Sequence, residues 1–201
     1  DALLQAQTGT RAPIANNDKP QDLVDALRYQ DLQSIDNAKL TKASLAESPW
    51  SDDYWAIYKG ILGWRYADSR FPADQNWKNN FDYIQTNPAS KILASGNANA
   101  IDLLSPAEKY DALIGDNAGS LTQWMWKQGK DYYDQSGKVE SWMGICHGWA
   151  PAAYMLNRPQ HTITVKAPNG ISLNFYPSDI KALASLLWAN AAADTRFIGG
   201  R

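Results

Sequence analysis

The sequence has little of several residue types and patterns that define large functional classes. Its 201 residues contain one cysteine and two histidines, and the formal net charge is only −2. A single thiol cannot form an internal disulfide, so cysteine usage does not settle the compartment. The small charge provides no basic field for nucleic acid or an anionic membrane. No apolar run approaches the roughly 20 residues that span a bilayer.

What the chain does have is aromatic side chains on an ordinary apolar background. It contains nine tryptophans and ten tyrosines, and 44% of its residues are hydrophobic. Most of these rings are expected to form an aromatic-rich core. The length fits one domain with an extended arm. We expect an N-terminal arm or strap with a short helix over residues 1–45 and a main domain over 46–201.

Local patterns predict several helices followed by one hairpin. We expect a helix over 20–34 and another over 52–66, the latter capped by Ser51 with Asp52 and Asp53 in its first turn. Further helical segments are expected over 76–85, from Ser90 to Leu93, and over 105–113, 120–133 and 180–191. Alternating residues over 161–166 and 171–175 flank an Asn-Gly pair and predict a hairpin. This order is that of an α+β fold.

Two of the predicted helices carry predicted inward faces. The helix over 120–133 is expected to turn Leu121, Trp124, Met125 and Gly129 inward. The helix over 180–191 is expected to have Leu183, Leu186, Leu187 and Asn190 near one face.

The cysteine lies where a loop is expected to turn into a helix. Cys146 follows Gly144-Ile145 and precedes a run of small residues that ends at Ala153. Unpaired backbone N–H groups and the positive end of a helix dipole then face the sulfur, which favours a thiolate. Gly144 and Gly148 allow a backbone or a substrate to approach closely. Pro151 suits an early helical position.

Two interpretations of Cys146 remain open at this point. A lone cysteine is often a small buried hydrophobic residue without reactivity. It is a nucleophile only if a base lies nearby in the fold. Trp142 and Trp149 flank the thiol, and aromatic walls of this kind exclude water and shape an acyl pocket.

The run Ser-Trp-Met-Gly-Ile-Cys-His-Gly-Trp-Ala-Pro-Ala-Ala at 141–153 resembles the nucleophile segment of a known family. It is similar to the secreted transglutaminase elicitors of oomycetes and bacteria, within the papain-like and transglutaminase-like cysteine superfamily. Pro-Trp-Ser-Asp-Asp-Tyr-Trp at 49–55 and Trp-Ala-Asn-Ala at 188–191 resemble that family less specifically. The resemblance covers most of residues 45–201.

The resemblance implies a papain-like, transglutaminase-like catalytic domain and a protein-glutamine γ-glutamyltransferase. A helix carrying Cys146 would pack on an antiparallel sheet that this chain supplies only in part. The cysteine would form a thioester with a protein glutamine and pass the acyl group to lysine or another primary amine. Its backbone N–H and Trp142 would hold the oxyanion, and Trp142 or Trp149 would line the acyl channel beside Gly144 and Gly148. The resemblance also implies a secreted, extracellular or periplasmic protein.

The base for this chemistry is harder to place in the sequence. His147 adjoins Cys146, and neighbours on a helix point about 100° apart, so its ring is poorly placed to be the base. His161 stands at a predicted strand start and is a weaker alternative. In the resembled family the catalytic His and Asp follow the helix that ends near Ala191. We therefore expect a C-terminal polypeptide of the same precursor, separated by processing after Arg201, to complete the site as a second chain. The alternative is a chain truncated after Arg201.

Other functions stay open beside transglutamination. The same nucleophile serves a papain-like cysteine peptidase, and the fold also serves a non-catalytic secreted recognition or elicitor protein. Calcium stimulation is left open: Asp52-Asp53 and Asp116-Asn117 are acidic or amide pairs, but no EF-hand spacing appears. Both pairs are interpreted as helix-cap and turn chemistry. Neither nucleic acid nor a membrane is expected as a partner.

Overall fold

The computed structural model describes residues 26–191. The chain divides into two units, residues 1–46 with 192–201 and residues 47–191. The described part of the first unit holds α2 (Leu32–Asn37), which begins where the Asp31 carboxylate accepts a hydrogen bond from the Ser34 N–H. The helix predicted over 20–34 is therefore wrong for residues 26–31, which precede this cap, and its residues 20–25 lie outside the described residues.

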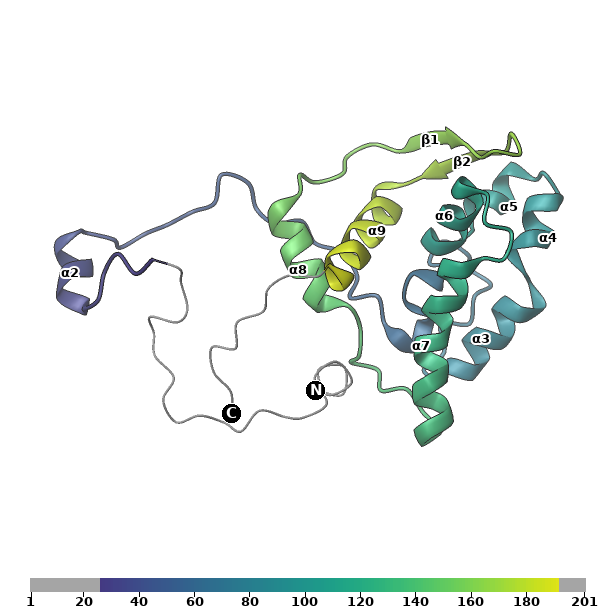
Figure 1. Cartoon of the computed structure of the whole chain (residues 1–201), viewed down its shortest axis with the longest axis horizontal. Helices are drawn as coiled ribbons and strands as arrows, with labels where there is room; N and C mark the ends of the chain where they lie inside the picture. Colours follow the sequence, from purple (N-terminus) through teal and green to yellow (C-terminus); the bar gives the residue numbers. More distant parts are fainter. Residues whose placement is uncertain (1–25, 192–201) are drawn as a thin grey trace. The chain divides into compact units, whose positions relative to one another are not determined.

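The second unit is rich in helices and contains one small antiparallel sheet (Figure 1). In chain order its elements are η2 (Ile57–Lys59), η3 (Ile61–Gly63), α3 (Trp77–Thr86), α4 (Ala89–Ala94), α5 (Ala98–Asp102), α6 (Pro106–Ile114), α7 (Ser120–Ser136), α8 (Cys146–Met155), β1 (Ile163–Lys166), β2 (Ser172–Phe175) and α9 (Pro177–Asn190). This composition confirms the predicted α+β class. No helix within residues 26–191 has the length and apolar character to cross a membrane.

Helices with strong local caps begin where the sequence places them. Asn76 caps α3 through the Lys78 N–H. Ser105 and Glu108 form a reciprocal capping box at the start of α6. The cap predicted at Ser90 is wrong, because α4 already begins after Pro88. Helix α5 was not predicted, and its cap is Asn97.

The helix predicted over 52–66 is wrong. Residues 51–56 are extended or irregular, and only the two short 3-10 turns η2 and η3 follow. Positive φ angles at Trp55, Gly60 and Ile61 interrupt any α-helix. Trp55, Tyr58, Ile61 and Leu62 of this segment are nevertheless buried.

Two helices bury only part of their predicted inward faces, since Met125 and Gly129 of α7 and Leu186 of α9 are buried as predicted. In α7 the buried residues are Met125, Trp126 and Gly129, while Trp124 is exposed. In α9 they are Asp179, Ala182, Ser185 and Leu186, while Leu187 is exposed. The reason on α7 is close packing: a Cβ at Gly60 or Gly63 would lie 2.4 Å from the Trp126 ring. Gly60 and Gly63 therefore leave the space that the Trp126 ring occupies.

The hairpin forms as predicted. Strands β1 and β2 pair antiparallel with Ile163 opposite Phe175, and Gly170 closes the turn with a φ of 84°. Leu173 and Phe175 of β2 are buried. The hairpin packs on α5, α6 and α9, and the helix that packs most extensively on α8 is α9. In Figure 1 these two helices lie side by side.

Two buried ion pairs tie the helical layers together. Arg65 binds Glu108 at 2.6 Å, and Lys109 binds Asp179 at 2.7 Å. Asp179 also accepts hydrogen bonds from the Tyr66 hydroxyl and the Tyr176 N–H. These contacts join α6 and α9 to the segment that follows η3, and so they set the position of α9 beneath α8.

Candidate functional site

Cys146 is the first residue of α8, as its sequence context predicts, and its side chain is exposed. The Gly148 and Trp149 N–H groups both donate to the Ile145 carbonyl. The N–H groups of Cys146 and His147 have no hydrogen-bond partner among residues 26–191. Two free donors and the positive end of the helix therefore lie beside the sulfur.

The two glycines around the cysteine make room for this chain's own backbone. A Cβ at Gly148 would lie 2.1 Å from the Ser185 carbonyl oxygen, so α8 touches α9 there. A Cβ at Gly144 would lie 2.3 Å from the Tyr54 carbonyl oxygen. The close approach predicted at these two glycines is therefore made by this chain's own backbone. It holds the loop before Cys146 and the start of α8 in place.

Pro151 does not occupy the early position predicted for it. It lies inside α8, beyond the first turn. Residue 151 would otherwise donate the helical hydrogen bond to the His147 carbonyl, and proline has no N–H to donate. The first turn of α8 is therefore held chiefly by its tertiary contacts.

The two tryptophans that flank the cysteine differ in their surroundings. Trp142 is 71% exposed. Trp149 is half-buried, and its indole N–H donates to the Trp50 carbonyl at 3.3 Å. Trp149 packs with Trp188 against the buried Trp50. Trp142 alone of the two presents most of its ring to an incoming molecule.

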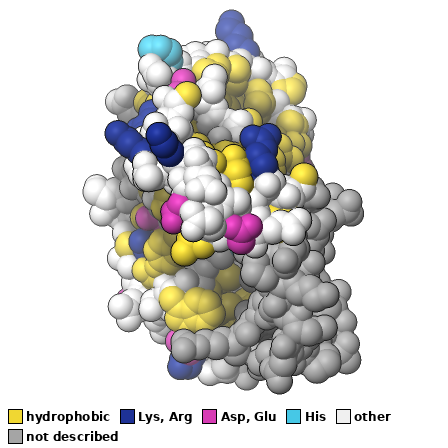
Figure 2. All heavy atoms as spheres, turned by 90° about the vertical axis from the view of Figure 1, so that its left-hand side faces the viewer, with side chains coloured by type: hydrophobic (Ala, Val, Ile, Leu, Met, Phe, Trp, Pro, Cys, Tyr) yellow, Lys and Arg dark blue, Asp and Glu magenta, His cyan; other side chains and the backbone are white. Residues whose placement is uncertain are grey.

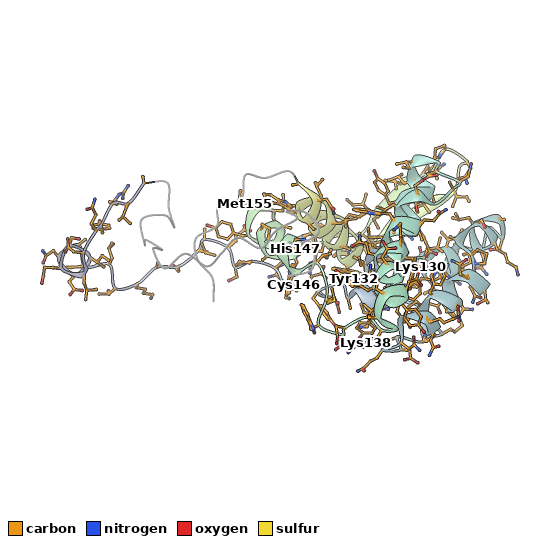
Figure 3. All side chains as sticks on the ribbon, turned by 60° about the horizontal axis from the view of Figure 1, so that its bottom comes forward. Lys130, Tyr132, Lys138, Cys146, His147 and Met155 are labelled. Atoms are coloured by element: carbon orange, nitrogen blue, oxygen red, sulfur yellow. The ribbon has the colours of Figure 1, made fainter. Side chains whose placement is uncertain are left out.

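Neither histidine is joined to the cysteine. Both are exposed, and within the described part of the chain neither forms a hydrogen bond with the Cys146 thiol. Figure 3 shows His147 beside Cys146 at the start of α8, with Met155 toward the other end. His161 precedes β1, which begins at Ile163. The structure brings no imidazole to the sulfur as a hydrogen-bonded base.

Residues from all three family-like stretches meet in one cluster. Trp50, from the first stretch, is buried against Ala152 and Ala153 of α8. Trp188 of α9, from the third, packs on the same cluster. The Trp50 indole N–H donates to the Leu156 carbonyl at 3.0 Å, directly after α8. Residues around Trp50 and Tyr54 were not predicted to support the cysteine, because a helix was expected there.

The acidic pairs considered for calcium are already engaged. Asp52 accepts the Trp55 indole N–H and Asp53 accepts the Trp55 backbone N–H. Asp116 accepts the N–H groups of Ala118 and Ser120. No cluster of three side chains able to hold a metal occurs within residues 26–191. The Asp52-Asp53 pair therefore serves a turn, although not the helix cap predicted.

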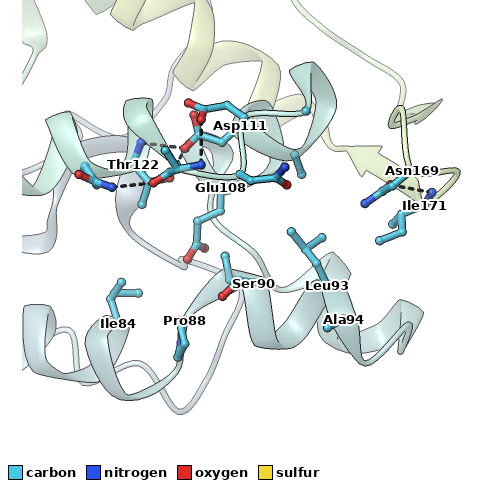
Figure 4. Close-up of a pocket in the computed structure, with 18 of the residues that line it drawn as sticks. Ile84, Pro88, Ser90, Leu93, Ala94, Glu108, Asp111, Thr122, Asn169 and Ile171 are labelled. Atoms are coloured by element: carbon cyan, nitrogen blue, oxygen red, sulfur yellow. Dashed lines mark hydrogen bonds between the residues drawn. The ribbon is translucent and has the colours of Figure 1, made fainter.

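A cavity of about 540 Å³ lies away from the cysteine. Figure 4 shows it between α4, the start of α7 and the hairpin turn. The Glu108 and Asp111 carboxylates that line it are committed, Glu108 to Arg65 and Asp111 to the Leu121 and Thr122 N–H groups. No residue of α8 or of the loop before it lines this cavity.

Fold and site together define a helix-rich α+β domain with an exposed cysteine at a helix start. The sequence matches the family described as transglutaminase elicitor over residues 26–201, and the chain belongs to that family. A solved structure, the GP42 transglutaminase from Phytophthora sojae, is similar at 22% identity and a TM-score of 0.49. The match covers 96% of this chain and 47% of that one, so the chain spans about half of its length. No curated protein matches the sequence.

Proposed function

We propose that the protein is a transglutaminase-type enzyme with Cys146 as its nucleophile. The observation that carries this proposal is the position of the only cysteine, exposed at the first residue of α8 beside two N–H groups that have no partner among residues 26–191. A structural cysteine is typically buried, and this one is not. Membership of the transglutaminase elicitor family supports the same chemistry.

The reaction takes place in two balanced steps. The Cys146 thiolate attacks the side-chain carboxamide of a protein glutamine, and the tetrahedral intermediate collapses by breaking the C–N bond. Ammonia leaves with a proton from the base, and a thioester remains. A neutral lysine amine then attacks the thioester and passes a proton to the base, the C–S bond breaks, and an isopeptide bond forms while the thiolate is regenerated. Water in place of the amine gives deamidation.

The free N–H groups of Cys146 and His147 suit the developing oxyanion. They lie at the positive end of α8 and have no partner to give up among the described residues. Donors aimed at a forming charge lower the barrier, and each is worth about 3–4 kcal/mol in comparable sites. Trp142, with its exposed ring, is the better candidate for the acyl channel, since Trp149 is engaged with Trp50.

We further propose that the base and its carboxylate partner come from polypeptide beyond this chain. Neither histidine is hydrogen-bonded to the thiol within the described residues, so the proposed chemistry needs a base from another polypeptide. A C-terminal polypeptide of the same precursor, separated by processing, would dock on the open side of α8 and complete a catalytic triad. By the same family membership we propose an extracellular location.

The test uses the full precursor with and without Cys146→Ala. We expect the parent protein to incorporate a fluorescent primary amine into casein and to release ammonia, and the variant to lose both activities. Cys146→Ser is the matched control for folding, since it keeps the shape of the side chain. Amine incorporation retained in Cys146→Ala would reject the assignment. Peptide-bond cleavage without ammonia release would favour a cysteine peptidase, and an intact thiol with neither activity would favour a recognition protein.

A further inference from the structure

The segment Tyr54–Ile57 runs beside the loop that presents Cys146. The Ile145 N–H donates to the Tyr54 carbonyl at 2.9 Å, and the Ile57 N–H donates to the Met143 carbonyl at 2.9 Å. The Tyr54 hydroxyl donates to the Ser141 carbonyl at 2.7 Å. Tyr54 therefore contacts the loop at both ends, five residues before the cysteine and directly before it.

The ring of Tyr54 fills the space that Gly144 leaves open. A Cβ at Gly144 would lie 2.7 Å from the Tyr54 Cδ2 atom. The phenol is only half-buried, so it lies at the surface from which a substrate would reach Cys146. Burial and the nearby Tyr58, Asp53 and Cys146 raise the pKa of Tyr54 to about 12. The hydroxyl thus remains a protonated donor at neutral pH.

The backbone next to Tyr54 is strained in order to hold this position. Trp55 has a φ of 50°, which is unusual for a bulky residue. Asp53 accepts the Trp55 N–H at 2.9 Å and Asp52 accepts its indole N–H at 2.9 Å. The Trp55 ring is buried against Trp64 and Tyr66. Strain of this kind persists only where the surroundings enforce it, and it gathers at functional sites.

We propose that Tyr54 is a positioning residue for Cys146, because its hydroxyl, ring and carbonyl together hold the 141–145 loop so that the sulfur and the two free N–H groups face one point. The expected effect of Tyr54 on turnover rests on the proposed function. The expected effect on the reactivity of the Cys146 thiol does not. Tyr54 touches no reacting atom in this scheme and acts through the loop.

The variant Tyr54→Phe keeps the ring and removes the hydroxyl bond to the Ser141 carbonyl. The full precursor is used, and its Cys146 is alkylated with iodoacetamide across pH 5–9. We expect alkylation at neutral pH to slow by about threefold to tenfold and its pH profile to move upward, the scale of one lost hydrogen bond. In amine incorporation we expect kcat to fall by a similar factor with KM unchanged.

Tyr110→Phe is the matched control, since Tyr110 is exposed on α6 and its hydroxyl has no hydrogen-bond partner among the described residues. It should match the parent protein in both assays. A Tyr54→Phe protein with a lower melting temperature but unchanged alkylation profile and kcat would overturn the proposal, as the tyrosine would then be structural only. If Cys146→Ala retains activity, the proposed function fails, and the alkylation profile alone decides the role of Tyr54.

Discussion

Two regions of the second unit treat their polar groups in opposite ways. Around α6, the carboxylates of Glu108 and Asp179 are buried, and each of their oxygens accepts at least one hydrogen bond. Around the start of α8, the N–H groups of Cys146 and His147 have no partner among residues 26–191. The buried carboxylates of the first region are fully paired, although Arg65 Nη1 is buried there without a hydrogen-bond partner among residues 26–191. The second region has two backbone N–H donors without a partner among the same residues.

Exposed apolar side chains occur in both regions, and on α6 they are Tyr110 and Ile114. Near α8 several large hydrophobic side chains are exposed, namely Trp142, Tyr154, Met155 and Leu156, with Leu187 on the neighbouring α9. Hydrophobic side chains are also visible at the surface in Figure 2. Contiguous exposed apolar surface commonly marks a binding site. The exposed apolar side chains near α8 support the proposed docking of a second polypeptide there.

The largest effect on stability should come from a substitution that breaks a buried ion pair of the α6 region. Lys109→Met leaves the Asp179 carboxylate buried without its cation, and we expect the free energy of unfolding to fall by about 3–5 kcal/mol. Urea denaturation followed by fluorescence measures it. The control is Lys127→Met, which removes an exposed pair with Asp131 and should cost less than about 1 kcal/mol. Equal losses in the two variants would show that the buried Lys109–Asp179 pair stabilises the fold no more than the exposed pair does.

The next effect tests whether the frame of α8 depends on its contact with α9. Gly148→Ala places a Cβ against the Ser185 carbonyl, and we expect a loss of about 1–3 kcal/mol together with slower alkylation of Cys146. Gly137→Asn is the control, because Gly137 has open space around it and asparagine tolerates its positive φ. Thermal unfolding and iodoacetamide kinetics measure both. A Gly148→Ala protein with parental stability would show that the packing of α8 on α9 does not depend on this close contact.

Within the α8 region, Trp149 is expected to contribute to stability and Trp142 to substrate binding. Trp149→Ala removes a packed ring and its bond to the Trp50 carbonyl, and we expect a loss of about 2 kcal/mol in stability. Trp142→Ala removes an exposed ring, so stability should change by less than about 0.5 kcal/mol. The reverse holds for amine incorporation, where Trp142→Ala should show the larger rise in KM for a glutamine substrate. A destabilised Trp142→Ala protein would refute this division of roles.

The sequence predicts best where one local device decides the structure. The capping box at Ser105, the Asn-Gly turn before Ile171 and the small-residue run after Cys146 each act over a few residues. The position of Cys146 at the start of a helix could therefore be predicted. The segment around Trp55 could not, because its path depends on hydrogen bonds to residues 143 and 145, far away in sequence. The Ser-Asp-Asp pattern of a helix cap is used there to bind Trp55.

The same limit applies to the groups that support the site. Nothing local in the sequence pairs Lys109 with Asp179 or brings Tyr54 to Gly144. Trp126 and Trp124 are two positions apart in one helix, and Trp126 is the one that packs where Gly60 and Gly63 leave space for its ring. Pairings of this kind become visible only once distant elements are in contact. The sequence therefore predicted Cys146 at a helix start but not the contacts that hold it there.

The smallest expected effect on stability concerns Asp68 and depends on pH. Burial opposes ionisation of Asp68, but hydrogen bonds from Arg70 and Tyr83 prevail and lower its pKa from the ordinary value of 3.8. Its contribution to stability is therefore fully present above that value and is lost as the pH falls through the lowered pKa. Because Arg70 is largely exposed, Asp68→Asn should cost less than about 1 kcal/mol at pH 6. Urea unfolding at pH 6 and at pH 3 should show the gap between parent and variant narrowing in acid, and a gap that widens would mean that protonated Asp68 is the form the fold prefers.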